Sequence, residues 1–197
     1  MKVARLTGIC SVIGGASWTA ACFVHNSLPQ GCIDEGCVDR TMRGSTPVAL
    51  VLFVLAGLML ACAGLGLLRL TRERTGLGKL GVAAAAAGGV GLLLLAAASA
   101  VSTFVDNDWD GMPGLVVPGI LLLAASLVLV AAVVIRARLV PVGLSSPLLA
   151  TALLLPLANE QTSRILLAVP FGLCWLGLGV ELLRRHSDAG QPTAVTP

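Results

Sequence analysis

Two cysteines stand five positions apart in a polar stretch of the chain, and thiols at this spacing could form a covalent bond. Cys32 and Cys37 lie within the segment Pro-Gln-Gly-Cys-Ile-Asp-Glu-Gly-Cys, residues 29–37. On an oxidising side of a membrane such a pair forms a structural disulfide most simply, and we predict one here. Thiol–disulfide exchange is the alternative, but it needs a second reactive pair or a quinone-facing partner, and the sequence has no Cys-x-x-Cys. The other four cysteines lie in apolar stretches, where we expect packing roles: Cys10, Cys22, Cys62 and Cys174.

Three acidic residues alternate along a second polar stretch, in a pattern that could bind a cation. Asp106, Asp108 and Asp110 precede Gly111, which gives the spacing D-x-D-x-D-G of the first half of a calcium loop. The twelfth position of such a loop carries a bidentate Glu, whereas this chain has Val117. The favoured interpretation is therefore an acidic loop outside the membrane, with no cofactor. A weak external Ca²⁺ site is the alternative.

Glu181 is the only acidic residue within an apolar stretch of the chain. Arg184 and Arg185 follow three and four positions later, on the same face of a helix. We predict an interfacial ion pair rather than a proton-carrying group. The apolar stretches otherwise lack the carboxylates or histidines that mark proton paths, which argues against a proton-coupled transporter.

The composition indicates the medium in which these residues lie. Hydrophobic residues make up 56% of the 197 residues and charged residues 12%, whereas a soluble domain carries roughly a quarter charged residues. This balance excludes a soluble enzyme, a disordered chain and a nucleic-acid-binding domain. A helix needs about 20 apolar residues to cross a bilayer. We therefore predict an all-α integral membrane domain over residues 1–185, followed by a short disordered tail over 186–197. Its six spans are residues 4–24, 47–68, 80–104, 114–135, 143–157 and 165–183.

The basic residues predict the orientation of this domain, because loops rich in Lys and Arg stay in the cytoplasm. With the N-terminus inside and six spans, ten of the thirteen basic residues face the cytoplasm, and only Arg40, Arg43 and Arg164 face outward. The fifth span is short, and if it were re-entrant the pair at 184–185 would also face outward. We expect a multi-pass protein of a bacterial cytoplasmic membrane with both termini in the cytoplasm. Residues 19–22 resemble a lipoprotein signal end without its usual Leu, so we expect no cleavage there.

Small residues at four-residue spacing predict which helix faces approach one another closely, because small side chains permit close helix packing in lipid. These residues are Gly57 and Ala61 in the second span and Gly81, Ala85 and Gly89 in the third. A second small-residue stripe on the third span, Ala84 and Gly88, predicts that this helix is central and has neighbours on more than one face. Packing within one chain is the favoured use, and self-association is the alternative.

The C-terminal stretch, residues 159–185, contains the pattern Pro-x-Gly-x-x-Trp-x-x-x-Gly, which begins at Pro170 and ends at Gly179. It resembles the last helix of small membrane proteins of unknown role from high-GC Gram-positive bacteria. The resemblance implies a membrane protein and no particular activity. Gly172 and Gly179, seven residues apart, predict a smooth face for another helix.

These features favour a non-enzymatic structural or accessory membrane component, in contact with the bilayer and acting through a second membrane protein or a second copy of itself. A small transporter or channel-like protein for a neutral or apolar solute is the second hypothesis. Thiol–disulfide exchange outside the cytoplasm is the third. The short loops leave no room for a soluble catalytic domain.

Overall fold

The computed structural model describes residues 2–31, 43, 46–76, 78–104, 109–159 and 161–188. These residues form helices and no strand, as the sequence predicts. The elements are α1 (Lys2–Asn26), α2 (Pro47–Thr75), α3 (Lys79–Phe104), α4 (Met112–Arg136), α5 (Val142–Leu154), η1 (Leu155–Leu157), η2 (Ser163–Ala168) and α6 (Val169–Asp188).

Five helical segments are long and apolar enough to cross a membrane. Four of them are α1 to α4, and the fifth is Ser163–Arg185, which joins η2 to α6. The segment Gly143–Leu157 is apolar but shorter, because Pro156 lies in the 3-10 turn that ends α5. The last helix ends at Asp188, inside the segment expected to be a tail, and residues 189–197 lie outside the described residues.

Helix α2 has clear signals at both ends and extends well beyond its apolar span. Thr46 caps its first turn by accepting a hydrogen bond from the Ala49 amide at 3.2 Å, and Pro47 occupies the first helical position, where a missing N–H costs nothing. Gly76 ends the helix at a φ of 76°, a region that favours glycine. The helix therefore continues for two polar turns past the predicted boundary at residue 68.

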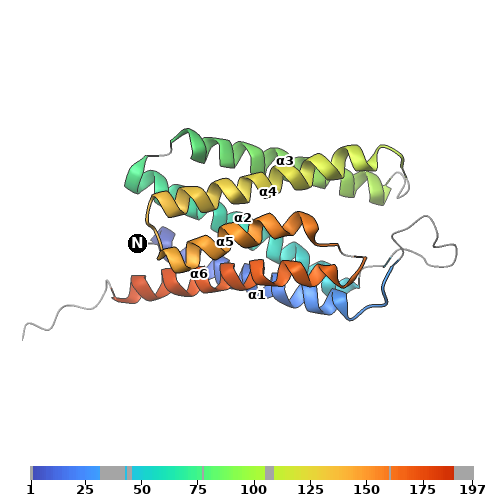
Figure 1. Ribbon diagram of the computed structural model, residues 1–197, viewed down its shortest axis with the longest axis horizontal. Helices are drawn as coiled ribbons and strands as arrows, with labels where there is room; N and C mark the ends of the chain where they lie inside the picture. Colours follow the sequence, from blue (N-terminus) through green and yellow to red (C-terminus); the bar gives the residue numbers. More distant parts are fainter. Residues whose placement is uncertain are drawn as a thin grey trace, which may run out of the picture.

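The helices form an elongated bundle in which α1 lies between α2 and α6 (Figure 1). Helix α3 packs extensively against α4, and α5 lies between α4 and α6. The N-terminus and the end of α6 lie at the same end of the bundle (Figure 1). Consecutive long helices run antiparallel, as short connections between them require.

Glycines form the contact between α1 and α6. Gly8 and Gly15 face Gly179 and Gly172, so that two glycines seven residues apart on one helix meet two on the other. A Cβ atom on Gly179 would lie 2.6 Å from the Gly8 carbonyl oxygen. The backbones therefore approach more closely than any larger side chain would allow.

The prediction that the third span is central is wrong. Among the described helices, α3 packs extensively against α4 alone, and it lies at the edge of the bundle (Figure 1). The face that it uses carries Ala84, Gly88 and Gly91. Gly91 is buried, and a Cβ atom there would lie 2.9 Å from the Gly119 carbonyl oxygen of α4. Residues 83–87 are all alanine, so small residues occur on every face of α3 and do not reveal which face has a neighbour.

Candidate functional site

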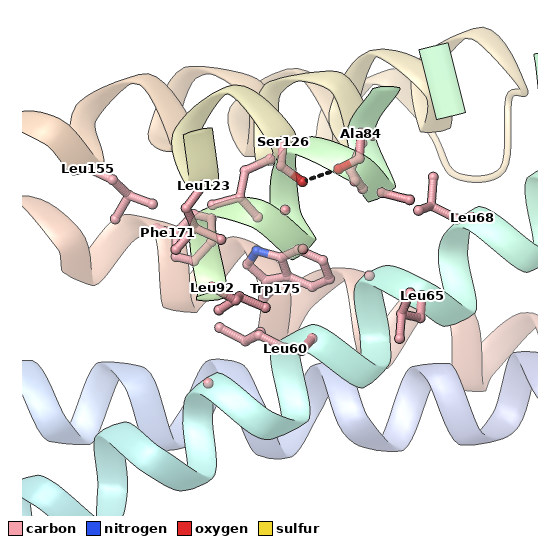
Figure 2. A pocket seen from close by; sticks show the side chains of 18 of the residues that line it. Leu60, Leu65, Leu68, Ala84, Leu92, Leu123, Ser126, Leu155, Phe171 and Trp175 are labelled. Atoms are coloured by element: carbon pink, nitrogen blue, oxygen red, sulfur yellow. Dashed lines mark hydrogen bonds between the residues drawn. The ribbon is translucent and has the colours of Figure 1, made fainter. Parts of the chain in front are cut away.

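A cavity of about 290 Å³ lies between α2 and α3, where these helices diverge. Residues of α4 and α6 form walls on the side opposite the gap. Figure 2 shows the side chains that surround it. Its walls are apolar and include Leu60, Leu68, Leu92, Leu123, Phe171 and Trp175. No charged residue lines it, so it suits an apolar molecule rather than an ion.

Small residues keep the gap between α2 and α3 open. Gly57, Ala61 and Gly64 line the cavity from α2, and Ala85 and Gly89 line it from α3. Gly57 and Gly89 are exposed, and a Cβ atom on either would have no neighbour within 4 Å. The expectation that these residues pack against a neighbouring helix is therefore wrong for Gly57 and Gly89. Gly81 of the same predicted stripe is buried, whereas Ala85 is exposed.

Trp175 forms part of one wall of the cavity, and its ring nitrogen is enclosed by other residues. Its side chain is 1% exposed, and its Nε1–H has no hydrogen-bond partner among the described residues. Figure 2 shows this nitrogen on the ring edge that lies towards Leu123 and Phe171, two other lining residues. A buried donor without an acceptor costs roughly 1–3 kcal/mol. Because the nitrogen is itself buried, a molecule in the cavity does not reach it.

The position of Trp175 is fixed from two sides. Ser11 of α1 is fully buried and donates its hydroxyl hydrogen to the Trp175 carbonyl oxygen at 2.6 Å. The Phe171 ring lies edge to face with the indole, with ring centroids 6.1 Å apart. Ser11 therefore holds the backbone of Trp175 and Phe171 contacts its ring, and neither contact uses the N–H group.

Ser126 is the one hydroxyl residue in the cavity wall, and its hydrogen is already donated. Ser126 Oγ donates to the Ala84 carbonyl oxygen at 2.7 Å, which joins α4 to α3 (Figure 2). A Cβ atom on Gly88 would lie 2.7 Å from Ser126 Oγ, so the glycine leaves room for the hydroxyl to reach the α3 backbone. This bond positions the α3 wall of the cavity.

We expect Ser126→Ala to lower the free energy of unfolding by about 0.6 kcal/mol, the average for a hydrogen bond between membrane helices. The measurement is SDS-induced unfolding in mild detergent, followed by tryptophan fluorescence. Ser27→Ala is the matched control, because Ser27 Oγ bonds only within its own turn at an exposed site. Equal effects of the two substitutions would contradict the assigned role of Ser126.

Glu181 contacts both of the arginines that follow it. Arg185 Nε lies 2.8 Å from Glu181 Oε1 and Arg184 Nε lies 3.9 Å from Glu181 Oε2. Arg185 also donates to the Leu139 carbonyl oxygen at 3.2 Å. This cluster ties the end of α6 to the turn between α4 and α5, and it lies outside the cavity.

A contact at the opposite end of the bundle joins the first polar loop to the segment before η2, and nothing in the sequence pattern indicated it. Gln161 Oε1 accepts from the Arg43 amide at 2.6 Å, and the Gln161 carbonyl oxygen accepts from the Gly31 amide at 2.9 Å. Arg43 is 8% exposed and donates to the Pro29 and Leu28 carbonyl oxygens. Arginine was expected here as an outward-facing charge, and its burial among carbonyl oxygens gives it a structural role.

The predicted disulfide and most of the predicted calcium site lie outside the described residues. Cys32, Cys37, Asp106 and Asp108 belong to the segments that the structure does not describe, so both interpretations stay predictions. Asp110 is exposed in the turn before α4. Within the described ranges, no three residues of the metal-binding types lie close enough to hold an ion. The four described cysteines are free thiols.

The chain matches no known protein-family model, and no curated protein and no solved structure is significantly similar to it.

Proposed function

We propose that this chain is a non-enzymatic, multi-pass component of a bacterial cytoplasmic membrane that holds a bilayer lipid in the cavity between α2 and α3. We further propose six spans with both termini in the cytoplasm. The apolar cavity of about 290 Å³ between α2 and α3 is the observation that carries the binding proposal. It has no charged lining residue and it adjoins the gap between two helices.

Three features support binding from the side of the membrane. The cavity lies between helices that are apolar and long enough to span a bilayer. Most of the residues that line it from α2 and α3 are glycine or alanine, which leaves more space in the gap between these helices than larger side chains would. An acyl chain gains nothing from leaving one apolar medium for another, so the shape of the cavity would have to provide the preference for the cavity over bulk lipid.

The proposed orientation rests on the charge distribution and on the positions of the helix ends. With six spans, ten of the thirteen basic residues lie on the same side of the membrane. The N-terminus and the end of α6 lie at one end of the bundle (Figure 1), as an even number of spans requires. A short apolar segment, Gly143–Leu157, would then be the fifth span.

The transport hypothesis has less support. A path for a solute requires polar groups or water along the whole bundle, whereas this cavity is apolar and the hydrogen of its one hydroxyl group is already donated within the protein. Exchange chemistry at Cys32 and Cys37 stays a separate prediction, to be tested by trapping a mixed disulfide from either single Cys→Ser variant.

Native mass spectrometry of the protein, extracted from its membrane in mild detergent, tests the binding proposal. We expect one lipid to remain bound per chain. Trp175→Phe should reduce the retained fraction about threefold, because the smaller ring removes part of the apolar wall that the lipid chain would contact. Trp109→Phe is the control, since Trp109 is exposed and lies outside the cavity. Extraction of a lipid-free chain under conditions that preserve its fold would contradict the proposal.

A further inference from the structure

We infer that the lipid in this cavity is an anionic one from the cytoplasmic leaflet, with its acidic head group at Arg69 and Arg72. This inference rests on the proposed lipid-binding function and adds the chemical class of the ligand.

The cavity borders a second, more open hollow at the polar end of α2. The second hollow has a volume of about 670 Å³. Its walls include Leu65, Leu68 and Ala85, and these three residues also line the first cavity. The remaining residues of its wall are Arg69, Arg72 and Glu73. An apolar site and a charged site thus adjoin along one gap, which is the arrangement that an amphiphile requires.

The spacing along α2 gives this combined site the length of a lipid chain. Ala61, Leu65, Leu68 and Arg72 follow one another at spacings of three or four residues, so they lie on one face of the helix. From Gly57 to Arg72 the helix rises by about 22 Å at 1.5 Å per residue. The hydrocarbon core of a bilayer measures roughly 30 Å. The site therefore extends over most of the core and ends beside charged residues.

The charges at this end favour an anion. Arg69 Nε lies 3.5 Å from Glu73 Oε1, and both side chains are more than half exposed, so this pair is weak. Arg72 forms no ion pair with another residue of the described chain. Two guanidinium groups and one carboxylate leave a net charge of +1, and a guanidinium can bind phosphate oxygens through two hydrogen bonds.

The bilayer supplies the occupant that fits both parts. A helix from a second copy would fill the apolar part. It would form no ion pair with the two arginines unless it also carried an acidic residue level with them. A zwitterionic lipid would fill the apolar part, but its own ammonium group offsets its phosphate, so it would not match the net charge of +1. An anionic phospholipid provides the chain and the charge in one molecule.

Native mass spectrometry with defined lipids tests this inference. The full-length protein in detergent is incubated with phosphatidylglycerol or phosphatidylcholine that carry identical acyl chains. We expect the wild type to retain one phosphatidylglycerol per chain with at least a fivefold preference over phosphatidylcholine. The double variant Arg69→Gln/Arg72→Gln should bind both lipids alike, at the level of phosphatidylcholine in the wild type.

The matched control is Arg136→Gln/Arg138→Gln, which removes the same charge from exposed positions at the same end of the bundle. This control should keep the fivefold preference. Equal retention of both lipids by the wild type would overturn the anionic head group and leave the lipid-binding function intact. Retention of neither lipid would overturn both proposals. A lipid-free dimer would show that a second copy occupies the gap, and would also overturn both.

Discussion

Replacement of Gly15 by Leu is expected to lower the free energy of unfolding by about 3 kcal/mol, the largest effect of any single substitution considered for this bundle. A Cβ atom at this position would lie 2.6 Å from the backbone nitrogen of Leu176. Backbone atoms of α6 cannot rotate away as the end of a flexible side chain can. The two helices would have to separate, which costs the upper part of the usual range for overpacking. SDS-induced unfolding in mild detergent gives this free energy.

Gly114→Leu is the matched control for this prediction. Gly114 also lies in a membrane-length helix, and a Cβ atom there would have no neighbour within 4 Å. The same change in side-chain size should therefore leave the unfolding free energy within about 0.5 kcal/mol of the wild type. If Gly15→Leu were as stable as Gly114→Leu, the close contact of α1 with α6 would be wrong.

Replacement of Ala61 by Leu is expected to reduce lipid retention at least tenfold without loss of stability. Ala61 lines the cavity, and the cavity is about 290 Å³, which leaves room for the added side chain. The new leucine would occupy the space proposed for the lipid chain and contact the opposite wall. Because it fills a void, we expect unfolding free energy equal to or above that of the wild type.

Ala96→Leu is the control, because Ala96 is an exposed α3 residue that does not line the cavity. It should retain lipid as the wild type does. Retention of lipid by Ala61→Leu at the wild-type level would place the bound molecule elsewhere on the protein surface. A large drop in stability for Ala61→Leu would show that the gap between α2 and α3 is narrower than described.

The helices themselves could be predicted from the sequence because the length of each apolar run sets the length of a membrane helix. The fourth span was expected at 114–135, and α4 runs from Met112 to Arg136. The segment 143–157 is predicted as a fifth span that is shorter than the others, and it is a short helix followed by a 3-10 turn. Its two prolines, Pro147 and Pro156, account for its short length.

The neighbours of each helix could not be predicted as well as the helices themselves. Small residues show that a helix face can pack closely, but they do not show which helix packs against it. Gly8 and Gly15 repeat the spacing of Gly172 and Gly179, and that shared interval is a signal for the α1–α6 contact that the prediction overlooked. On α3 the run of alanines places small residues on every face of the helix. Only the position of Ser126, which reaches the Ala84 carbonyl oxygen, distinguishes the packed face from the exposed one.

The candidate site was missing from the prediction for a related reason. A void appears only where helices diverge, and this divergence depends on contacts between residues far apart in the chain. Trp175 was part of a recognised pattern, but a tryptophan that precedes small residues usually packs inside a bundle. That its Nε1–H lacks a hydrogen-bond partner can be determined only from the positions of its neighbours in the folded chain.

Heavy-atom quenching of Trp175 by brominated lipid tests the central claim most directly. The variant Trp18→Phe/Trp109→Phe leaves Trp175, which lines the cavity, as the only tryptophan. Trp18 also lines the cavity and donates to the Ala168 carbonyl oxygen at 2.9 Å, so this variant must first retain lipid as the wild type does. In bilayers of lipid brominated along the acyl chains, a chain inside the cavity should quench Trp175 fluorescence by about half, since bromine acts only at contact distance. Addition of Ala61→Leu to this variant should abolish the quenching. Fluorescence of Trp175 that is the same in brominated and ordinary lipid would contradict the claim that a lipid occupies the cavity.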